Sequence, residues 1–277
     1  MVLLESTLLI RKIGHYKLII KEINKETCIE LLQTYHYSAI MPRLTKYYLG
    51  AFVDNKLIGC LTLGWGTQPK GTIKKLFPEL ETKDYFEIGK MALLDEMPRN
   101  TETQFLSAII KWIKHNIPEL KYLYTLADGI QGKCGYVYQA ANFYYGGSYT
   151  TLVYRSKDGE KIHPRTASEL CKENAKMLGK DKVFWLTADF LKLKEIDKIQ
   201  GLMFRYIYPL NRQAKKYLQE SSVSWNKEYP KDKDLKFKKL VDKGKYIEID
   251  APTFNKDNYF YNTQKIVKKE RQLELWQ

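Results

Sequence analysis

The sequence predicts an α+β protein in which helices pack on a mixed β-sheet. Between residues 22 and 155, apolar runs of strand length alternate with segments of helical periodicity. The order is helix, two hairpin strands, strand, helix, strand, helix, strand, which describes a mixed sheet with helices on it. The chain has 277 residues, 44% hydrophobic and 28% charged, so it can bury a core and remain soluble.

The first expected elements are a helix and a hairpin. Residues 21–36 form a short helix with an apolar face made of Ile29, Leu31, Leu32 and Tyr35. Residues 46–65 form a hairpin, because two apolar runs are joined by Asp54 and Asn55, which favour a tight turn. A third strand follows at residues 85–94.

The most regular helix is expected at residues 98–116. Asn100 or Thr101 can cap its start, and Glu102 is favourable in its first turn. Its apolar stripe consists of Phe105, Leu106, Ile109, Ile110 and Ile113. A strand is expected next, at residues 120–127.

The following segment combines short elements. Residues 135–147 are expected to be a helix ended by glycines, and residues 148–162 a hairpin that turns at its Lys-Asp-Gly sequence. Residues 166–179 are expected to be a helix and residues 201–210 a strand. Beyond this strand the chain is basic and less periodic, so the pattern gives no element boundaries.

The charge of the chain is strongly positive and unevenly distributed. The net charge is +14, of which residues 1–150 carry about +4 and residues 151–277 about +10. A basic half attracts polyanions, and the 21 tyrosines and 5 tryptophans suit stacking on exposed bases. The alternative is that the charge only serves solubility.

The sequence predicts no membrane segment and no disulfide framework. No apolar run approaches the roughly 20 residues that cross a bilayer, and the N-terminal segment does not have the pattern of a signal peptide. The four cysteines are far apart and form no C-x-x-C pair: Cys28, Cys60, Cys134 and Cys171. We therefore expect a cytoplasmic protein.

Several stretches, in this order, resemble the Mom family of phage DNA-modification proteins, which is related to the GNAT acyltransferase fold. They are Tyr35–Ser38, Leu49–Gly64, Glu87–Thr103 and Ala127–Gly147, with a weaker match at Phe204–Leu210. The resemblance implies a GNAT-like catalytic domain over residues 1–160. From the charge distribution, we expect residues 161–277 to form a basic extension that completes the fold and contacts double-stranded DNA.

The activity implied by the resemblance is modification of the exocyclic amine of adenine in DNA. The product is a carbamoylmethylated base or a related acyl-derived one, which protects phage DNA from host restriction in the host cytoplasm. Three positions depart from the family pattern. Lys90 stands where the family usually has Arg, Thr103 where it commonly has Ser, and Lys133 where His is common.

The carbon donor is not identified by the sequence. GNAT acetyltransferases bind the pyrophosphate of coenzyme A on a glycine-containing loop at a helix N-terminus. The corresponding junction here, Leu93–Phe105, contains no glycine and carries Asp95, Glu96 and Glu102, which would repel a pyrophosphate. The cofactor therefore stays unknown: acetyl-CoA remains a candidate without a recognisable loop, and a metal ion could also take part.

Asp128 is the first candidate catalytic residue. It ends a predicted strand and begins the stretch ADGIQGKCGYVYQAANFYYGG, which is rich in tyrosine and glycine. The exocyclic amine of adenine is a poor nucleophile, so a general base that accepts its proton would accelerate transfer by roughly 10²–10⁴-fold. The alternative is structural, since Asp is also a favoured helix N-cap.

A second group of candidates follows Asp128 on the helix expected at residues 135–147. Tyr138 could hydrogen-bond the reacting group or stack on an extruded base. Gln139 and Asn142 could read an adenine edge, since Asn and Gln pair bidentately with adenine. Alternatively, Tyr138 and Asn142 only share the helix face that packs on the sheet. Lys133 and Tyr136 complete this group of substrate-binding or DNA-binding candidates.

The remaining candidates lie earlier in the chain. His36 could be a second proton carrier, or a metal ligand together with Asp128; the alternative is a structural histidine. The resemblance places Tyr37 and Ser38 in the substrate site, where Tyr37, Tyr136 and Tyr138 would wall the base pocket. The donor's charge or a phosphate could be held by Lys90, Arg99 and Thr103.

Surface ion pairing is the alternative role for these last three residues, with Glu87 or Glu102 as partner. Two other functions remain open for the whole chain. The first is an N-acetyltransferase that uses acetyl-CoA on a small-molecule or protein amine. The second is a DNA-binding protein without catalytic activity. The sequence does not indicate an oligomeric state.

Overall fold

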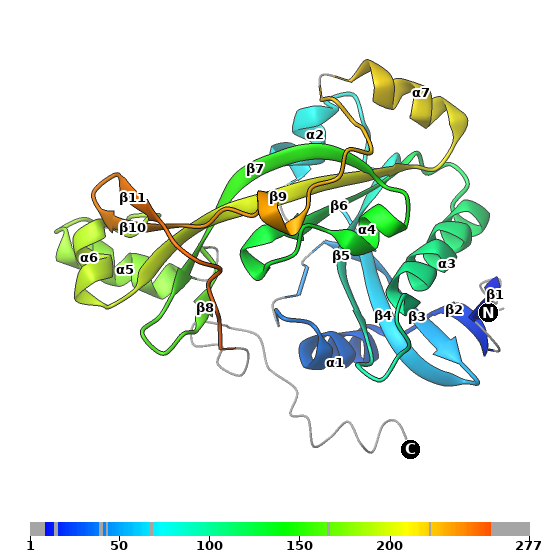
Figure 1. Cartoon of the computed structure of the whole chain (residues 1–277), viewed down its shortest axis with the longest axis horizontal. Coiled ribbons are helices and arrows are strands. Elements are labelled where there is room, and N and C mark those ends of the chain that lie inside the picture. The colour runs from blue at the N-terminus through cyan, green and yellow to red at the C-terminus, as the bar shows by residue number, and fades with distance from the viewer. Residues whose placement is uncertain are drawn as a thin grey trace.

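The computed structural model describes residues 9–13, 16–38, 41–42, 44–66, 69–164, 167–221 and 223–255. In this part of the chain a mixed β-sheet carries helices, as the α+β prediction required (Figure 1). No helix among these residues combines the length and the apolar composition that crossing a bilayer needs.

The first half of the sheet is an antiparallel meander. Its strands are β1 (Leu9–Ile13), β2 (Tyr16–Glu22), β3 (Thr45–Val53), β4 (Lys56–Gly64) and β5 (Tyr85–Leu93). Each strand pairs antiparallel with the next. The predicted turn between β3 and β4 is confirmed: Asp54 and Asn55 have φ values of 48° and 65°, as a two-residue hairpin turn of this hand requires.

The strand β6 (Tyr122–Asp128) joins this meander in parallel with β5. The pairing covers only Tyr85–Glu87 of β5, opposite Tyr122–Tyr124 of β6, although both strands continue. Beyond it, the hydroxyl of Thr125 donates to the carbonyl of Ile88 at 3.4 Å. The later parts of the two strands are therefore free of backbone pairing with each other, and Lys90 and Asp128 lie there.

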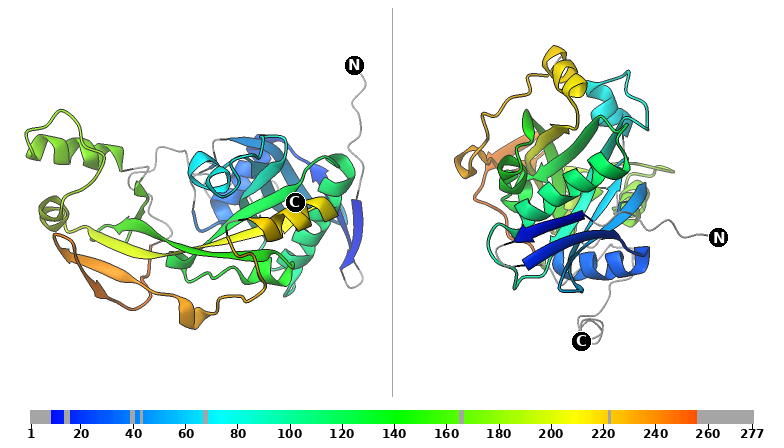
Figure 2. Two further views of the ribbon diagram at one scale, coloured as in Figure 1. Left: turned by 90° about the horizontal axis from the view of Figure 1, so that it is seen from above. Right: turned by 90° about the vertical axis from the view of Figure 1, so that its right-hand side faces the viewer.

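The second half of the sheet is built from later parts of the chain. Its strands are β7 (Tyr144–Arg155), β8 (Lys161–Ile162), β9 (Asp197–Pro209), β10 (Lys238–Asp242) and β11 (Lys245–Glu248). β9 pairs antiparallel with β6 and also with β7, so it lies between them. Figures 1 and 2 show β7 and β9 as a long ribbon that leads from the core to a lobe. β9 thus completes the sheet beside Asp128.

Two helices cover opposite faces of the meander. The helices among the described residues are α1 (Lys25–Tyr35), α2 (Ile73–Leu76), α3 (Thr101–Asn116), α4 (Tyr136–Ala140), α5 (Ser168–Met177), α6 (Ala188–Leu193) and α7 (Arg212–Glu220). α1 buries Cys28, Leu31 and Leu32 against Leu57 and Cys60 of β4. α3 packs on the opposite face, where its apolar stripe contacts Leu61 and Leu63, because successive strand residues point to opposite faces.

Two local expectations are wrong. Asn100 is the N-cap of α3, but its φ is 71° and its side chain makes no capping hydrogen bond. Thr101 instead donates to the carbonyl of Pro98 at 2.6 Å. The helix expected over residues 135–147 is only α4, which Asn142 follows with a φ of 65°. The glycines Gly146 and Gly147 belong to β7, where the pairing with β9 shifts its register.

Candidate active site

Charged and aromatic side chains gather where β5 and β6 are not paired. The Asp128 cluster comprises His36, Tyr37, Ser38, Lys90, Asp128 and Lys161. His36 caps the C-terminus of α1, so α1 delivers the first three residues. β5 supplies Lys90, β6 ends at Asp128 and β8 begins at Lys161. The cluster therefore joins segments that are far apart in the sequence.

Both carboxylate oxygens of Asp128 have a partner. Oδ1 accepts a hydrogen bond from the backbone N–H of Ile130 at 3.1 Å, which caps the short 3₁₀ helix Gly129–Gln131. Oδ2 accepts from Nζ of Lys161 at 2.8 Å, and these side chains are only 13% and 17% exposed. Oδ1 of Asp128 therefore has the helix-capping role considered from the sequence, whereas Oδ2 takes part in a largely buried ion pair.

Lys90 is the buried cation of the cluster. Its Nζ donates to the carbonyl of Ser38 at 2.8 Å and lies 2.9 Å from Nδ1 of His36. Burial and the positive charge of Lys161 lower the pKa of Lys90 to about 7, against the opposing charge of Asp128. Both the neutral and the protonated form of this amine are therefore populated near neutral pH, so Lys90 can either accept or release a proton there.

His36 is held as a neutral imidazole. Burial and the nearby Lys90 lower its pKa well below 6.5, although a hydrogen bond with the backbone of Ser38 opposes this. Nδ1 faces the Ser38 N–H at 3.1 Å and Nζ of Lys90, so in the neutral ring it is the acceptor and Nε2 carries the proton. Nδ1 is thereby engaged within the cluster. Among the described residues, no three His, Cys, Asp or Glu side chains are grouped to hold a metal.

Tyr37 and Tyr138 provide the aromatic surface beside Asp128. Tyr37 stacks on His36 with ring centroids 4.2 Å apart, and Nζ of Lys90 and of Lys161 lie 5.7 and 5.4 Å from its centroid. Burial, with Asp128 and Tyr138 nearby, raises the pKa of Tyr37. Burial also raises the pKa of Tyr138, whose hydroxyl hydrogen-bonds Thr125. Both phenols stay protonated at neutral pH.

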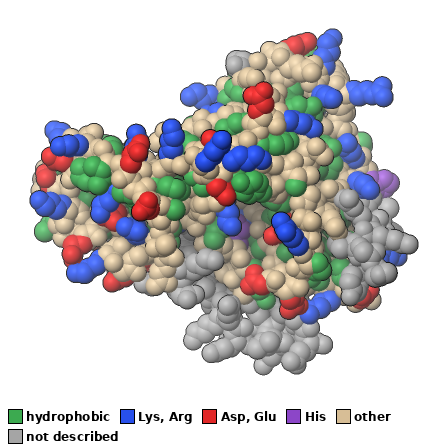
Figure 3. All heavy atoms as spheres, in the orientation of Figure 1, with side chains coloured by type: hydrophobic (Ala, Val, Ile, Leu, Met, Phe, Trp, Pro, Cys, Tyr) green, Lys and Arg blue, Asp and Glu red, His purple; other side chains and the backbone are tan. Residues whose placement is uncertain are grey.

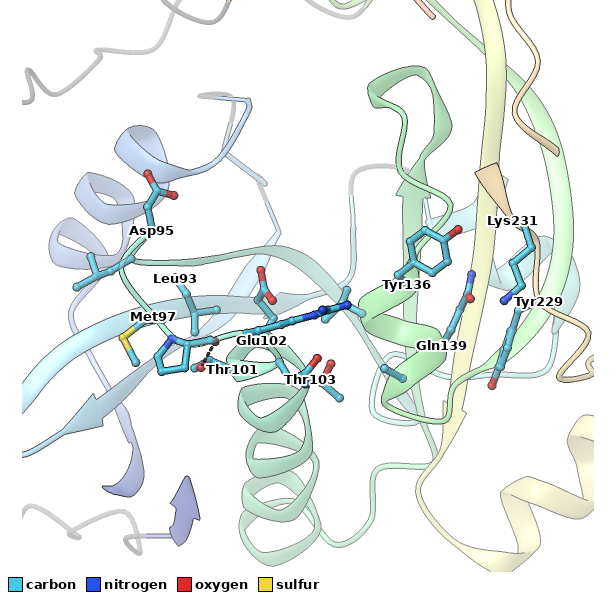
Figure 4. Close-up of a pocket in the computed structure, with 16 residues that line it drawn as sticks. Leu93, Asp95, Met97, Thr101, Glu102, Thr103, Tyr136, Gln139, Tyr229 and Lys231 are labelled. Carbon is cyan, nitrogen blue, oxygen red and sulfur yellow. Dashed lines mark hydrogen bonds between the residues drawn. The ribbon is translucent and has the colours of Figure 1, made fainter. Parts of the chain in front are cut away.

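A pocket, the α3 pocket, lies at the start of α3 and measures about 890 Å³. Figure 4 shows Thr101, Glu102 and Thr103 on one side, facing Tyr136, Tyr229 and Lys231 on the other. Arg99 and Lys231 bring two positive charges to its lining, and Asp95 and Glu102 bring two negative ones. Nζ of Lys231 lies 5.9 Å from the ring centroid of Tyr136.

The candidate residues therefore separate into groups. His36, Tyr37, Ser38, Lys90 and Asp128 come together in the Asp128 cluster, beside Tyr138. Arg99, Thr103, Tyr136 and Gln139 line the α3 pocket. Two candidates lie in neither group: Lys133 is exposed, and Asn142 is exposed and accepts a hydrogen bond from Lys227 at 3.3 Å.

Gln139 borders the α3 pocket with an amide that already has partners. Its Nε2 donates to the carbonyls of Cys134 and Pro230, at 3.3 and 3.1 Å, and to the hydroxyl of Tyr206 at 3.1 Å. The side chain is buried. The contacts tie α4 to β9 and to the segment before Lys231, so they position the wall of the pocket.

Sequence reasoning missed Lys161 and Lys231. Lys161 follows the turn of a predicted hairpin, and nothing in its surroundings distinguishes it from other lysines. Its contact with Asp128 depends on how β7 and β8 pass β6. Lys231 lies in the region where the pattern gave no boundaries.

Comparison with known proteins places the chain in a family. The model of the Mom protein family matches residues 17–231, which include the whole Asp128 cluster and the lining of the α3 pocket. The methylcarbamoylase Mom of Escherichia phage Mu is 32% identical over 189 residues, covering 68% of this chain and 73% of that protein. This chain belongs to the Mom protein family. Membership in the Mom family supports the expectation of a phage DNA-modifying transferase.

Solved acetyltransferase structures are similar to part of the chain. An aminoglycoside acetyltransferase in complex with coenzyme A and kanamycin is 13% identical, with a TM-score of 0.37, over 48% of this chain and 88% of that one. A ribosomal-protein-S5-alanine acetyltransferase from Vibrio fischeri is 12% identical, with a TM-score of 0.35, over 51% and 86%. These values are too low to assign an activity.

Proposed function

We propose that this Mom-family protein transfers a carbon group to the exocyclic amine of adenine in double-stranded DNA, as carbamoylmethylation or a related acyl-derived modification. The modified DNA would resist host restriction in the host cytoplasm. The observation that carries this proposal is the Asp128–Lys161 ion pair, next to Lys90 with its lowered pKa. Such a set of coupled acids and bases is typical of a site that moves protons.

The target base reaches the cluster by extrusion from the duplex. An adenine inside a stacked helix does not expose its amine to a buried carboxylate, so flipping is required, at a cost of a few kcal/mol. The rings of Tyr37 and Tyr138 can stack on the extruded base, and such stacking offsets about 1–3 kcal/mol. This gives the two tyrosines a binding role beside Asp128.

The proton of the attacking amine passes to the cluster. As the new nitrogen–carbon bond forms, one N–H bond of the amine breaks and its proton moves to Asp128, while the leaving group departs from the donor. Lys161 holds Oδ2 of Asp128 in place through its hydrogen bond. Lys90, which is neutral in part of the molecules near pH 7, is the next acceptor and is linked to His36.

The α3 pocket is the proposed place for the donor. It adjoins the cluster through β5 and α4, which contribute Leu93 and Val137 to its lining and Lys90 and Tyr138 to the site. Arg99 and Lys231 can hold an anionic group of the donor. A titration with coenzyme A tests whether that group is a coenzyme A pyrophosphate, and binding without DNA modification would favour an N-acetyltransferase of another amine.

Mass analysis of nucleosides tests the proposal. DNA from cells that express this chain should contain a new adenosine-derived species, whose mass identifies the transferred group. Asp128→Asn should reduce that species by roughly 10²-fold or more. The control Asp181→Asn makes the same substitution at an exposed position and should leave it unchanged. Full modification by folded Asp128→Asn protein would overturn the assignment of the base.

A wild-type protein that binds DNA but leaves its mass unchanged, with phage donors supplied by an infected-cell extract, would identify a DNA-binding protein without catalytic activity. In that case Asp128→Asn would bind DNA as the wild type does.

A further inference from the structure

A cluster of unpaired cations lies away from the Asp128 cluster and the α3 pocket. The α2–α7 ridge comprises Lys70, Lys74, Lys75, Arg212, Lys215 and Lys216, from α2 with the turn before it and from α7. Five of these side chains are exposed, and Lys74 is half-buried. Within the part of the chain that the structure describes, none of the six forms an ion pair with a carboxylate.

The packing beneath the ridge holds its two helices together. Ile73 and Phe77 from the α2 segment share a buried cluster with Ala214 and Leu218 of α7. Trp225 stacks on Phe77 with ring centroids 6.1 Å apart. Cations that the sequence separates by well over one hundred residues are thus presented by one rigid support. Figure 1 shows α2 and α7 at the same end of the molecule.

The balance of charges on the ridge differs from that on the lobe that contains α5 and α6. Residues 70–75 and 212–220 contain six cations and one carboxylate, Glu220. In Figure 3, Lys and Arg side chains gather at the end that holds α7, whereas red and blue side chains alternate over the lobe with α5 and α6. An array of cations with few acids is complementary to a phosphate backbone.

The ridge also has a fixed position relative to Asp128. The hydroxyl of Tyr122, at the start of β6, donates to the carbonyl of Ala214 in α7 at 2.9 Å. Asp128 ends the same strand, six residues later. At about 3.3 Å per residue, β6 spans about 20 Å, which corresponds to roughly six base pairs of duplex. One duplex can therefore contact the ridge and present a base to the cluster.

We propose that the α2–α7 ridge binds the phosphate backbone of double-stranded DNA while the target adenine occupies the Asp128 cluster. This inference rests on the proposed function, since it takes the substrate to be duplex DNA. It assigns binding of the phosphate backbone to a surface that the catalytic domain and the basic extension share. The lobe of α5, α6, β10 and β11 is not needed for this binding.

The test is the salt dependence of duplex binding by the full chain. The ridge variant is Arg212→Ala with Lys215→Ala and Lys216→Ala. The matched control is Lys236→Ala with Lys243→Ala and Lys245→Ala, which removes the same charge from exposed positions near the lobe. Binding of a fluorescent duplex is measured between about 50 and 200 mM salt, the range over which phosphate contacts change affinity steeply.

The ridge variant should bind at least about 10-fold more weakly at low salt, and its plot of log affinity against log salt should lose about 3 from its slope, roughly one per phosphate contact. The control should lose less than about 1. Replacing the three residues by Lys, Arg and Arg in order keeps their charge and should restore the slope. Thermal unfolding of each variant confirms that it is folded.

An equal loss of slope in both variants, or an unchanged slope in the ridge variant, would overturn the inference, as would a wild type that does not bind duplex DNA. Nucleoside mass analysis of the same proteins separates this result from the proposed function. If binding depends on the ridge but the DNA is not modified, the ridge inference is supported and the proposed adenine modification is rejected. If the DNA is modified but binding does not depend on the ridge, the proposed function is supported and the ridge inference is rejected.

Discussion

Nζ of Lys161 lies 2.8 Å from Oδ2 of Asp128, so the lysine at the start of β8 neutralises the carboxylate at the end of β6. The two residues come from opposite sides of the expected domain boundary at residue 160. The ion pair orients the carboxylate next to Tyr37, over whose ring Lys161 also lies. As the proposed general base, Asp128 is positioned by Lys161, which does not itself contact the proton that Asp128 accepts.

The ion pair should appear as coupling in a double-mutant cycle. Lys161→Met should lower the free energy of unfolding by about 1–3 kcal/mol, because it leaves a largely buried carboxylate without its cation. Asp128→Asn combined with Lys161→Met should cost at least about 1 kcal/mol less than the sum of the single changes. Denaturant unfolding measures all four proteins. Additive effects would show that the pair contributes no net interaction.

Lys90 should make stability depend on pH above neutrality. Its folded pKa is about 7, below the 10.5 of a free lysine. Between these values the unfolded chain binds a proton that the folded chain lacks, so the free energy of unfolding rises with pH. This one group contributes up to about 1.4 kcal/mol per pH unit. Lys90→Met should remove that rise, and Lys111→Met, at an exposed position, should keep it.

Glu160 should have the opposite effect below neutrality. It is buried, its Oε1 has no hydrogen-bond partner among the described residues, and burial with Asp158 nearby raises its pKa to about 7. Between about pH 4.5 and 7 the folded state binds the extra proton, so stability falls as pH rises through this window.

Glu160→Gln should therefore stabilise the protein by about 1–3 kcal/mol at pH 8 and leave it unchanged near pH 4. Thermal unfolding at the two values checks this, with the exposed Glu119→Gln as control. Equal stabilisation at both values would mean that the change acts through packing and not through ionisation.

The cations of the α3 pocket should affect donor binding more than the chemical step. Arg99→Ala and Lys231→Ala should each raise KM for the donor by about 10-fold with little change in kcat, since a charge-assisted hydrogen bond contributes about 1.5–3 kcal/mol. Lys233→Ala, an exposed neighbour, should change neither constant. A loss of kcat at constant KM would contradict a binding role.

Elements with strong local signals could be predicted from the sequence. The β3–β4 hairpin has turn residues that accept a positive φ, and α3 has a continuous apolar stripe. The end of α4 was misplaced because Asn142, and not a glycine, adopts the left-handed conformation. Strand β10 is short and lysine-rich, so its sequence carries little strand periodicity.

The site was predictable only where its residues follow a recognisable motif. Asp128, His36 and Lys90 lie in stretches that resemble the Mom family, and the structure brings them together. Lys161 has no such motif, and its partner is 33 residues away in the sequence. Contacts of this kind follow from the course of β7 and β8 through the sheet, which no local pattern encodes.

The position of β9 has a consequence for biosynthesis. Met203–Pro209 form the ladder that covers β6, so a nascent chain that has emerged only through Asp128 leaves this strand as an open sheet edge. At about 5–20 residues per second, it waits several seconds for its partner. Open edges pair with other chains. Premature termination before residue 203 should therefore yield aggregating fragments, not partly active ones.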